Sequence, residues 1–424
     1  MKKLRIGING NLPQPYGGVA TTCFHLTSQF LANGHSVYFY DRTAHYEKHR
    51  PDGLTDYTQT AMRKNIAILL AELLWLALRE KRFAALLFHF FQEALHLKLF
   101  RTNLKTTFRM LLTLLEMRKY FAGKQIDILY SQHALHESFA GLLLARHYFH
   151  CPFVVTVYAS EFTMDANRVW LPMAVQICNQ ADAVVCISEY TRQRMLQAGA
   201  TPKYASVFYL GADPVHFTPS NSDDMTAVSH RFGIVDSSPI ILYTGWLIER
   251  KGPQILLEAL SKVQHQPWQA IFVGPDHGLK KTLTEQVKLL QMQDRIVISG
   301  EIPYAELLAL YELAYAFVFP TLSRDEGFGL VALEAMAHGL PVIASRTGAI
   351  PEVVRENETG LFFPPGDAVI LAAQLQQVLN DENLRDQLGS AARKWAMQFS
   401  WEKSAVQVMQ VFETAITYHN AETI

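Results

Sequence analysis

The sequence predicts an α/β protein with two Rossmann-like domains, each built around a parallel sheet. Three observations predict this fold class: the length, the alternation of short apolar runs with helical stretches, and one polar break near the middle. At 424 residues the chain exceeds the usual size of a single core, and two domains are the natural division. A hydrophobic content of 49% and a charged content of 18% are typical of a folded protein rather than a disordered one.

The first domain is predicted over residues 1–218. Leu4–Ile8 is a short apolar run, and an amphipathic stretch begins after a Gly-Gly pair, which is the order strand, loop, helix. Asn and Gln residues interrupt the run too early for a signal peptide, so we interpret it as a strand. Similar apolar runs predict the other strands: Ser36–Tyr40, Ile126–Tyr130, Phe153–Tyr158, Ala183–Ile187 and Ser206–Leu210. This alternation predicts a doubly wound sheet with ligands at the carboxyl ends of its strands.

A polar segment separates this series from a second one. Residues 219–238 are rich in Ser, Asp and Pro, and we interpret them as a linker that opens a second domain over 219–400. The strands predicted there are Ile240–Thr244, Gln269–Val273, Arg295–Ser299, Ala316–Phe319, Pro341–Ala344 and Gly360–Phe363. We expect a final helix within 401–424 to pack back on the first domain. Two such domains are expected to face each other across a ligand-binding cleft.

A helical insertion is predicted in the first domain over about residues 45–122. Its segment 61–124 lacks strand patterns and carries twelve Lys and Arg against four Asp and Glu, in a chain of net charge −1. Basic amphipathic helices with Trp, Phe and Leu can lie on anionic membranes, so 61–122 is a candidate membrane-surface segment. Packing of a helical hairpin on the domain explains the same pattern, and both interpretations stay open.

Composition and charge also bear on where in the cell the protein lies and on what it binds. No apolar stretch is long enough to span a bilayer, which predicts a cytoplasmic protein, with peripheral attachment to the inner face of the membrane as the alternative. The near-zero net charge gives no nucleic-acid signal. The four cysteines have spacings typical of neither a disulfide framework nor a zinc site, so we expect them to be buried apolar residues.

The densest chemical signal is a Gly-rich loop between a predicted strand and a helix that starts near Leu330. Glu326 lies in the loop and Glu334 on the helix. The free N–H groups and the positive end of the helix dipole suit a diphosphate or sugar hydroxyls. Gly327 and Gly329 would let a ligand approach the backbone closely.

A second signal follows the first strand of the second domain, where Gly245 precedes the pair Arg250-Lys251. Two cations there could neutralise a pyrophosphate. A solvated helix start is the alternative. No Asp-x-Asp sequence occurs in the chain, and a metal-dependent diphosphate site would need such carboxylates, so we predict no metal and no other cofactor.

The first domain offers weaker candidates at or after the ends of predicted strands. Gly17 and Gly18 follow the first strand and His133 follows the third, whereas Tyr158 ends the fourth strand and Glu161 follows it. His133 fits packing or surface roles better than catalysis. A tyrosine is a poor base near neutral pH, because its reference pKa is about 10.

These motifs together resemble those of family-four retaining glycosyltransferases, the glycosyltransferase group 1, which have the two-domain GT-B fold. The Glu-x7-Glu spacing, Gly-Phe-Gly-Leu and Glu-Ala-Met-Ala all agree with that family. By this resemblance Glu326 lies beside the donor sugar and Glu334 holds the ribose hydroxyls. The backbone amides of Phe328 to Leu330 face sugar and phosphate, and Lys251 grips the diphosphate.

Some positions depart from the family pattern. The family arginine before Lys251 is Trp246 here, with Arg250 as the candidate replacement. The family histidine near the donor sugar is Tyr158, and Glu161 stands where the family has Asp. Gly17 and Gly18 correspond to the family's acceptor-side loop.

The resemblance implies a metal-independent, retaining transfer of a sugar from a nucleotide sugar. The acceptor would be a glycan, a lipid-linked molecule or a small molecule. Two alternatives stay open. One is another GT-B enzyme, such as a phosphorylase or an epimerase, because a fold does not fix a reaction. The other is a non-catalytic sugar-binding partner of an active transferase.

Overall fold

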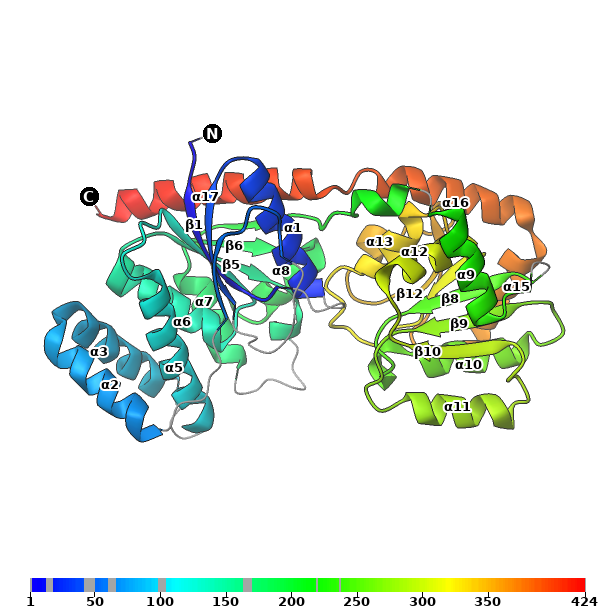
Figure 1. Ribbon diagram of the computed structural model, residues 1–424, viewed down its shortest axis with the longest axis horizontal. Coiled ribbons are helices and arrows are strands. Elements are labelled where there is room, and N and C mark those ends of the chain that lie inside the picture. Colours follow the sequence, from blue (N-terminus) through cyan, green and yellow to red (C-terminus); the bar gives the residue numbers. More distant parts are fainter. Residues whose placement is uncertain are drawn as a thin grey trace. The chain divides into compact units, whose positions relative to one another are not determined.

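The computed structural model describes residues 2–12, 18–41, 50–59, 66–97, 104–162, 170–218, 220–235 and 238–423. It divides into two compact units (Figure 1). Unit 1 comprises Met1–Tyr209 and Trp401–Ile424, and unit 2 comprises Leu210–Ser400. The division therefore falls after Tyr209, earlier than the boundary that the sequence predicts after residue 218.

Unit 1 contains a parallel sheet of seven strands in the order β3-β2-β1-β4-β5-β6-β7. The strands are β1 (Arg5–Gly10), β2 (Ser36–Asp41), β3 (Asp56–Gln59), β4 (Ile128–Gln132), β5 (Phe153–Val157), β6 (Ala183–Cys186) and β7 (Ala205–Val207). The first apolar run is a strand, as predicted. Strand order reverses between β1 and β4, so this is the switch point at which doubly wound sheets bind ligands.

The edge strand β3 corrects the sequence prediction. It lies within the range 45–122 assigned to a helical insertion, and it pairs in parallel with β2. Its residues Asp56, Tyr57, Thr58 and Gln59 lack an apolar run because an edge strand is only half covered. The helical part of the insertion therefore follows β3.

Helices cover both faces of this sheet. They are α1 (Gly18–Ala32), α2 (Ile66–Arg79), α3 (Lys81–His96), α5 (Leu104–Phe121), α6 (His136–Leu144), α7 (Leu171–Gln180), α8 (Glu189–Gln197) and α17 (Trp401–Thr423), with short turns η1 (Ala145–Phe149) and η2 (Ser160–Phe162). The last of these, α17, returns to unit 1 and packs along α1 (Figure 1). Phe412 of α17 contacts the rings of Phe30 and Tyr130, at centroid distances of 5.7 and 5.0 Å.

Helices α2 and α3 form a hairpin on the outer side of unit 1 (Figure 1). Their inward stripes join the main core of the unit, with Leu73, Leu76, Phe83, Leu86 and Phe90 buried. The inward stripes of α2 and α3 thus pack on the domain, as one of the two interpretations of residues 61–124 predicts. None of the described helices is both long and apolar enough to cross a membrane.

Unit 2 contains a parallel sheet of six strands in the order β10-β9-β8-β11-β12-β13. The strands are β8 (Ile240–Thr244), β9 (Gln269–Val273), β10 (Ile296–Gly300), β11 (Ala316–Phe319), β12 (Val342–Ser345) and β13 (Gly360–Phe363). Each lies within one residue of its predicted position. The switch point here lies between β8 and β11.

The helices of unit 2 pack on the two faces of its sheet. They are α9 (Ser222–Phe232), α10 (Pro253–Lys262), α11 (Lys280–Leu289), α12 (Tyr304–Leu313), α13 (Leu330–Ala337), α14 (Ile350–Val353), α15 (Ala368–Asn380) and α16 (Glu382–Ala396), with turns η3 (Pro214–Phe217) and η4 (Glu249–Lys251). Each α/β unit thus has the doubly wound architecture that the sequence predicts.

Helix α9 corrects the linker prediction for residues 219–238. The Asn221 side chain caps its first turn, and Val228 and Phe232, four residues apart, are buried on the side that meets α12. The polar run Ser222–Asp224 occupies its first turn, where acidic residues stabilise a helix. Composition alone did not separate this polar helix start from a linker.

Candidate donor site

Two loops meet at the switch point of unit 2, one after β8 and one after β11. Gly252 approaches Pro320 so closely that a Cβ at residue 252 would lie 1.9 Å from the Pro320 carbonyl oxygen. The Arg250 carbonyl accepts hydrogen bonds from the Leu322 N–H, at 2.9 Å, and from the Thr321 hydroxyl, at 3.2 Å. These contacts fix the cationic loop against the loop that carries Glu326.

An ion pair joins the two loops. Lys251 Nζ lies 2.5 Å from Glu326 Oε2, and the two side chains are 19% and 14% exposed. A charge-assisted hydrogen bond with this little water around it fixes both side chains. Lys251 and Glu326, 75 residues apart in the chain, are thus neighbours at the carboxyl ends of adjacent strands.

Arg250 and Trp246 lie beside this pair. The Arg250 side chain is exposed, and its guanidinium lies 5.7 Å from the centroid of the Trp246 ring. The indole stacks on His277 at 4.4 Å. The Trp246 carbonyl accepts a hydrogen bond from the buried Tyr243 hydroxyl, so backbone and ring are both held. Gly245, at φ +153°, makes the turn after β8.

The loop after β12 supports Glu326 from behind. The Glu326 carbonyl accepts a hydrogen bond from Ala349 N–H at 2.8 Å. Gly348, at φ +59°, lies so close that a Cβ there would come within 2.4 Å of the same carbonyl oxygen. This position therefore requires glycine for two independent reasons, the positive φ and the contact.

Residues 327–330 lead into helix α13. Gly327 and Gly329 are buried, and Gly329 adopts φ +95° as the residue before the helix. The Phe328 ring is buried against Phe399, at a centroid distance of 6.0 Å. Leu330 is the first helical residue, so the positive end of the α13 dipole lies directly after the loop that carries Glu326.

Glu334 lies one turn further along α13 and is half-buried. Removal from water raises the pKa of Glu334 to about 7, the charge of Asp213 adds to this, and a hydrogen bond from Tyr311 opposes it. The Tyr311 hydroxyl lies 3.2 Å from Glu334 Oε2 and 3.0 Å from the Thr244 hydroxyl. Glu334 is therefore a carboxyl group whose charge changes near neutral pH.

Unit 1 gathers its candidates at the ends of β4 and β5. The buried Glu161 carboxylate accepts hydrogen bonds from the N–H of Tyr158, at 3.0 and 3.1 Å, and from that of Ala134. His133 Nε2 lies 3.0 Å from the Ser160 hydroxyl and 3.6 Å from Glu161 Oε2. Glu161 thus positions both loops.

Tyr158 is almost fully buried, and its hydroxyl donates a 2.5 Å hydrogen bond to Gln132 Oε1. Burial raises the pKa of Tyr158 well above its usual value, so the phenol stays protonated. Gly18 is exposed at the first residue of α1. Gly17 lies outside the described residues.

Sequence reasoning missed several residues of the unit 2 site. Tyr311 reaches Glu334 from another helix, and nothing in its own segment singles it out. Gly348 and Gly252 carried a signal, because each is a glycine in a short loop after a predicted strand. Their requirement for glycine comes from backbones remote in the chain, which one sequence does not reveal.

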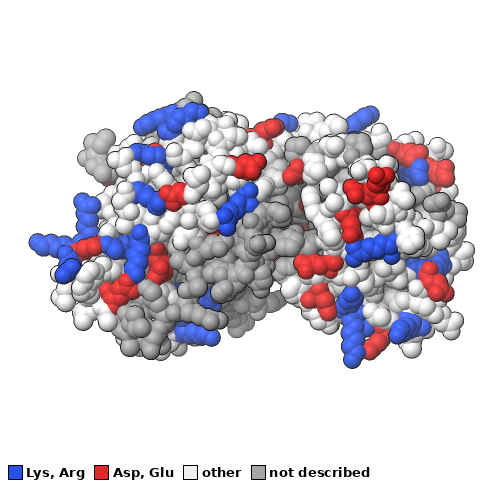
Figure 2. All heavy atoms as spheres, in the orientation of Figure 1, with Lys and Arg blue, Asp and Glu red and all other residues white. Residues whose placement is uncertain are grey.

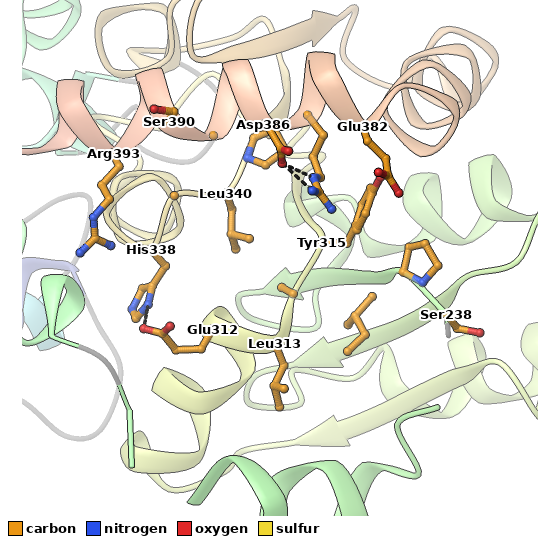
Figure 3. A pocket seen from close by; sticks show the side chains of 17 residues that line it. Ser238, Glu312, Leu313, Tyr315, His338, Leu340, Glu382, Asp386, Ser390 and Arg393 are labelled. Atoms are coloured by element: carbon orange, nitrogen blue, oxygen red, sulfur yellow. Dashed lines mark hydrogen bonds and ion pairs between the residues drawn. The ribbon is translucent and has the colours of Figure 1, made fainter. Parts of the chain in front are cut away.

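A separate cavity of about 720 Å³ lies at the amino ends of β8, β11 and β12 (Figure 3). Its described lining includes none of the predicted site residues. His338, just after α13, faces it, and its Nδ1 lies 3.0 Å from Glu312 Oε1. Arg385 and Asp386, consecutive residues of α16 that line the cavity, form an ion pair. The cavity therefore lies at the amino ends of the strands, whereas Lys251 and Glu326 lie at their carboxyl ends.

Two further expectations concern metals and cysteines. Within the described part of the chain, no group of three His, Cys, Asp or Glu side chains is arranged to hold a metal ion, and metal independence stays a prediction. All four cysteines, Cys23, Cys151, Cys178 and Cys186, are buried, as predicted, and form no disulfide.

Two family profiles match almost the whole chain. The profile described as Glycosyltransferase Family 4 covers residues 16–216, and that described as Glycosyl transferases group 1 covers residues 224–395. Each profile thus coincides largely with one of the two units.

Individual relatives agree with this assignment. The chain is 30% identical to a D-inositol 3-phosphate glycosyltransferase of Corynebacterium diphtheriae, over 68% of this chain and 71% of that protein. It is also 30% identical to a GDP-mannose-dependent alpha-(1-6)-phosphatidylinositol monomannoside mannosyltransferase of Mycolicibacterium smegmatis, over 58% and 66%. Other corynebacterial proteins are also named D-inositol 3-phosphate glycosyltransferase, and this chain matches them over 50 to 60% of their length.

The fold has close counterparts among solved structures. A sucrose-phosphate synthase from Thermosynechococcus elongatus superposes with a TM-score of 0.75 at 20% identity, over 98% of this chain and 100% of that one. This likeness confirms the GT-B fold class that the sequence motifs imply. The two profiles and the corynebacterial relative show that the chain belongs to the family 4, group 1 glycosyltransferases.

Proposed function

We propose that the chain transfers a sugar from a nucleoside-diphosphate sugar to an acceptor hydroxyl, with retention of anomeric configuration and without a metal ion. The observation that carries this is the Lys251–Glu326 pair at the switch point, next to the first turn of α13. It unites a fixed cation, a carboxylate and the N-terminus of a helix at the place where doubly wound sheets bind ligands.

Each group has a task in such a transfer. Lys251 and the more exposed Arg250 neutralise the diphosphate, whose negative charge grows as the glycosidic bond breaks. The N–H groups of residues 328–330 hold phosphate or sugar oxygens. The Glu334 carboxylate accepts hydrogen bonds from the ribose hydroxyls. Glu326 holds Lys251 in place and lies beside the donor sugar.

Retention follows if the acceptor attacks the face that the diphosphate leaves and the departing phosphate takes the acceptor proton. No protein base is then needed. This agrees with the buried, protonated Tyr158, which can donate a hydrogen bond but cannot accept a proton near neutral pH.

The relatives' names suggest where to look for substrates. GDP-mannose appears as a donor in one name, and an inositol phosphate and a phosphatidylinositol mannoside as acceptors in two. We propose a glycan, lipid-linked or small polyol acceptor for this chain. A thermal-shift screen of GDP, UDP and their sugars would identify the donor, because a bound ligand stabilises the folded state.

The decisive experiment compares donor turnover in single variants. We expect Glu326→Ala and Lys251→Ala to lower turnover about 100-fold, the size of effect of removing one group that stabilises the transition state. Lys281→Ala, on the exposed surface of α11, is the matched control. Nucleotide binding by the wild type without any turnover would instead favour a non-catalytic partner, the alternative that Trp246 and Tyr158 suggest.

Two finer parts of the proposal have their own measurements. Retention is read from the anomeric configuration of the product by NMR. Metal independence predicts the same rate in EDTA as in magnesium. An inverted product or a rate restored only by a divalent ion would contradict the respective part.

A further inference from the structure

The α2–α3 hairpin has a second apolar surface, on the side away from the core. Six large side chains there are 50 to 79% exposed, and we call them the outer hairpin face: Leu70, Leu74, Trp75 and Leu78 of α2, with Phe88 and Leu95 of α3. The core needs only the inward stripe of each helix. An apolar stripe facing water on both helices is unusual in a folded protein and marks an interaction surface.

The tip of the hairpin is cationic because its one acid turns inward. In the run Arg79-Glu80-Lys81-Arg82, the three cations are exposed. Glu80 instead pairs with Arg118 and accepts a 3.1 Å hydrogen bond from the Tyr148 hydroxyl. Lys and Arg side chains project around the tip at the left edge of Figure 2.

The other acids of the described segments 66–97 and 104–124 also have partners within unit 1. Glu72 and Glu116 both pair with Lys119, and Glu93 accepts hydrogen bonds from Gln176 and Gln180. All four acidic residues of these segments are half-buried, whereas their exposed basic residues include Arg79, Lys81, Arg82, Lys105 and Arg109. The surface of these segments therefore carries an excess of positive charge.

Apolar and cationic groups are adjacent on this surface. The Arg79 guanidinium lies 4.4 Å from the centroid of the half-exposed Trp75 ring. A long cationic side chain beside an indole, at the border of an aliphatic stripe, is the arrangement that suits the boundary between lipid headgroups and acyl chains.

We propose that the outer hairpin face docks on an anionic lipid bilayer, with both helices lying in the interface and the cations of the tip against the headgroups. A second copy of the chain fits less well. A two-fold dimer would place the same cationic surface on both sides of the contact, whereas an anionic bilayer supplies the opposite charge. The proposal does not depend on the donor site.

Flotation of the full chain with vesicles tests it. We expect binding to phosphatidylcholine vesicles that contain phosphatidylglycerol, much weaker binding to pure phosphatidylcholine, and loss of binding as salt rises. Trp75→Ser/Leu78→Ser and Lys81→Glu/Arg82→Glu should each lower partitioning about tenfold or more.

The controls are matched in exposure and lie in unit 2. Leu289→Ser removes an 85% exposed leucine of α11, and Lys281→Glu reverses an 88% exposed lysine of the same helix. Both should bind vesicles like the wild type, and thermal unfolding checks that every variant is folded.

Three outcomes would overturn the proposal: no flotation of the wild type, equal loss in the hairpin and control variants, or equal binding to charged and uncharged vesicles. Light scattering adds a fourth. In that outcome the wild type self-associates, Trp75→Ser/Leu78→Ser abolishes the self-association, and the wild type does not bind vesicles. The outer hairpin face would then be a contact between copies of the chain. Donor turnover in solution is measured separately, so failure here leaves the proposed reaction untouched.

Discussion

Glu334 carries a carboxyl group that the fold keeps partly protonated near neutral pH. Its pKa is raised from the ordinary 4.5 to about 7, mainly by burial. The folded state therefore binds a proton that the unfolded state releases. The stabilisation from this proton is complete below pH 4.5 and is lost as the pH rises through about 7.

This predicts a pH dependence of donor binding. Ribose hydroxyls donate to the ionised carboxylate, so binding of the nucleotide sugar should tighten as the pH rises from about 6 to 8. Glu334→Gln should bind more weakly and show little change over the same range. Calorimetry with an intact nucleotide sugar is the suitable measurement, because its diphosphate does not titrate there. A pH dependence that survives in Glu334→Gln would assign it to another group.

Gly348 tests how far the site depends on close backbone packing. Gly348→Ala places a Cβ against the Glu326 carbonyl at a residue with φ +59°. Gly233 has the same φ with open space around it, so Gly233→Ala reports the cost of the backbone conformation alone. We expect the Gly233 variant to lose about 1 kcal/mol and the Gly348 variant at least about 2 kcal/mol. Only the Gly348 variant should also lose turnover; equal effects would mean that the loop moves freely away from Glu326.

At the scale of the element, the hairpin presents two apolar stripes with different tasks. Phe90 of α3 is fully buried in the core of unit 1, whereas Phe88, two residues earlier, is 60% exposed. Phe90→Ala should lower the free energy of unfolding by about 3–5 kcal/mol. Phe88→Ala should change it by less than about 0.5 kcal/mol. Denaturant titration of both variants separates the stripes, and a large loss in the Phe88 variant would show that the outer face also packs.

Prediction from sequence succeeded for elements whose burial shows in their own residues. The strands of unit 2 are short apolar runs. Helix α13 begins directly after Gly329 and ends just before a glycine and a proline that stop a helix. The sequence therefore predicts the bounds of these strands and of α13 to within about one residue. The sequence does not predict strand β3 and helix α9, because neither has a long apolar pattern of its own. Contacts with neighbouring elements stabilise both of them. Asp56–Gln59 relies on β2 for pairing, and α9 buries only a narrow stripe against α12.

The candidate site was predictable to a similar limit. Two separate motifs predict Lys251 and Glu326, and the structure joins these residues by an ion pair because β8 and β11 are neighbours in the sheet. Tyr311 and Gly348 act on Glu334 and Glu326 from segments without a recognisable motif. Such second contacts depend on tertiary packing, which local patterns do not encode.

At the scale of the whole molecule, unit 2 is one continuous segment and unit 1 is not. The ends of unit 2 meet, since Ala212 and Ser400 form a bridge and Ala212 N–H donates to the Phe399 carbonyl at 3.1 Å. A self-contained core with adjacent ends is typical of a segment that folds alone. We expect a fragment of residues 210–400 to unfold cooperatively and to gain thermal stability from the donor nucleotide. A fragment with no cooperative transition would show that unit 2 needs the rest of the chain.

The return of α17 to unit 1 has a consequence for the order of synthesis. The ribosome makes all of unit 2 before Trp401, so unit 2 can acquire its native structure during translation. The core of unit 1 is complete only when Phe412 has been made and covers Phe30 and Tyr130. These two residues belong to the first third of the chain to emerge from the ribosome. The half of the protein that is started first is therefore the half that is completed last.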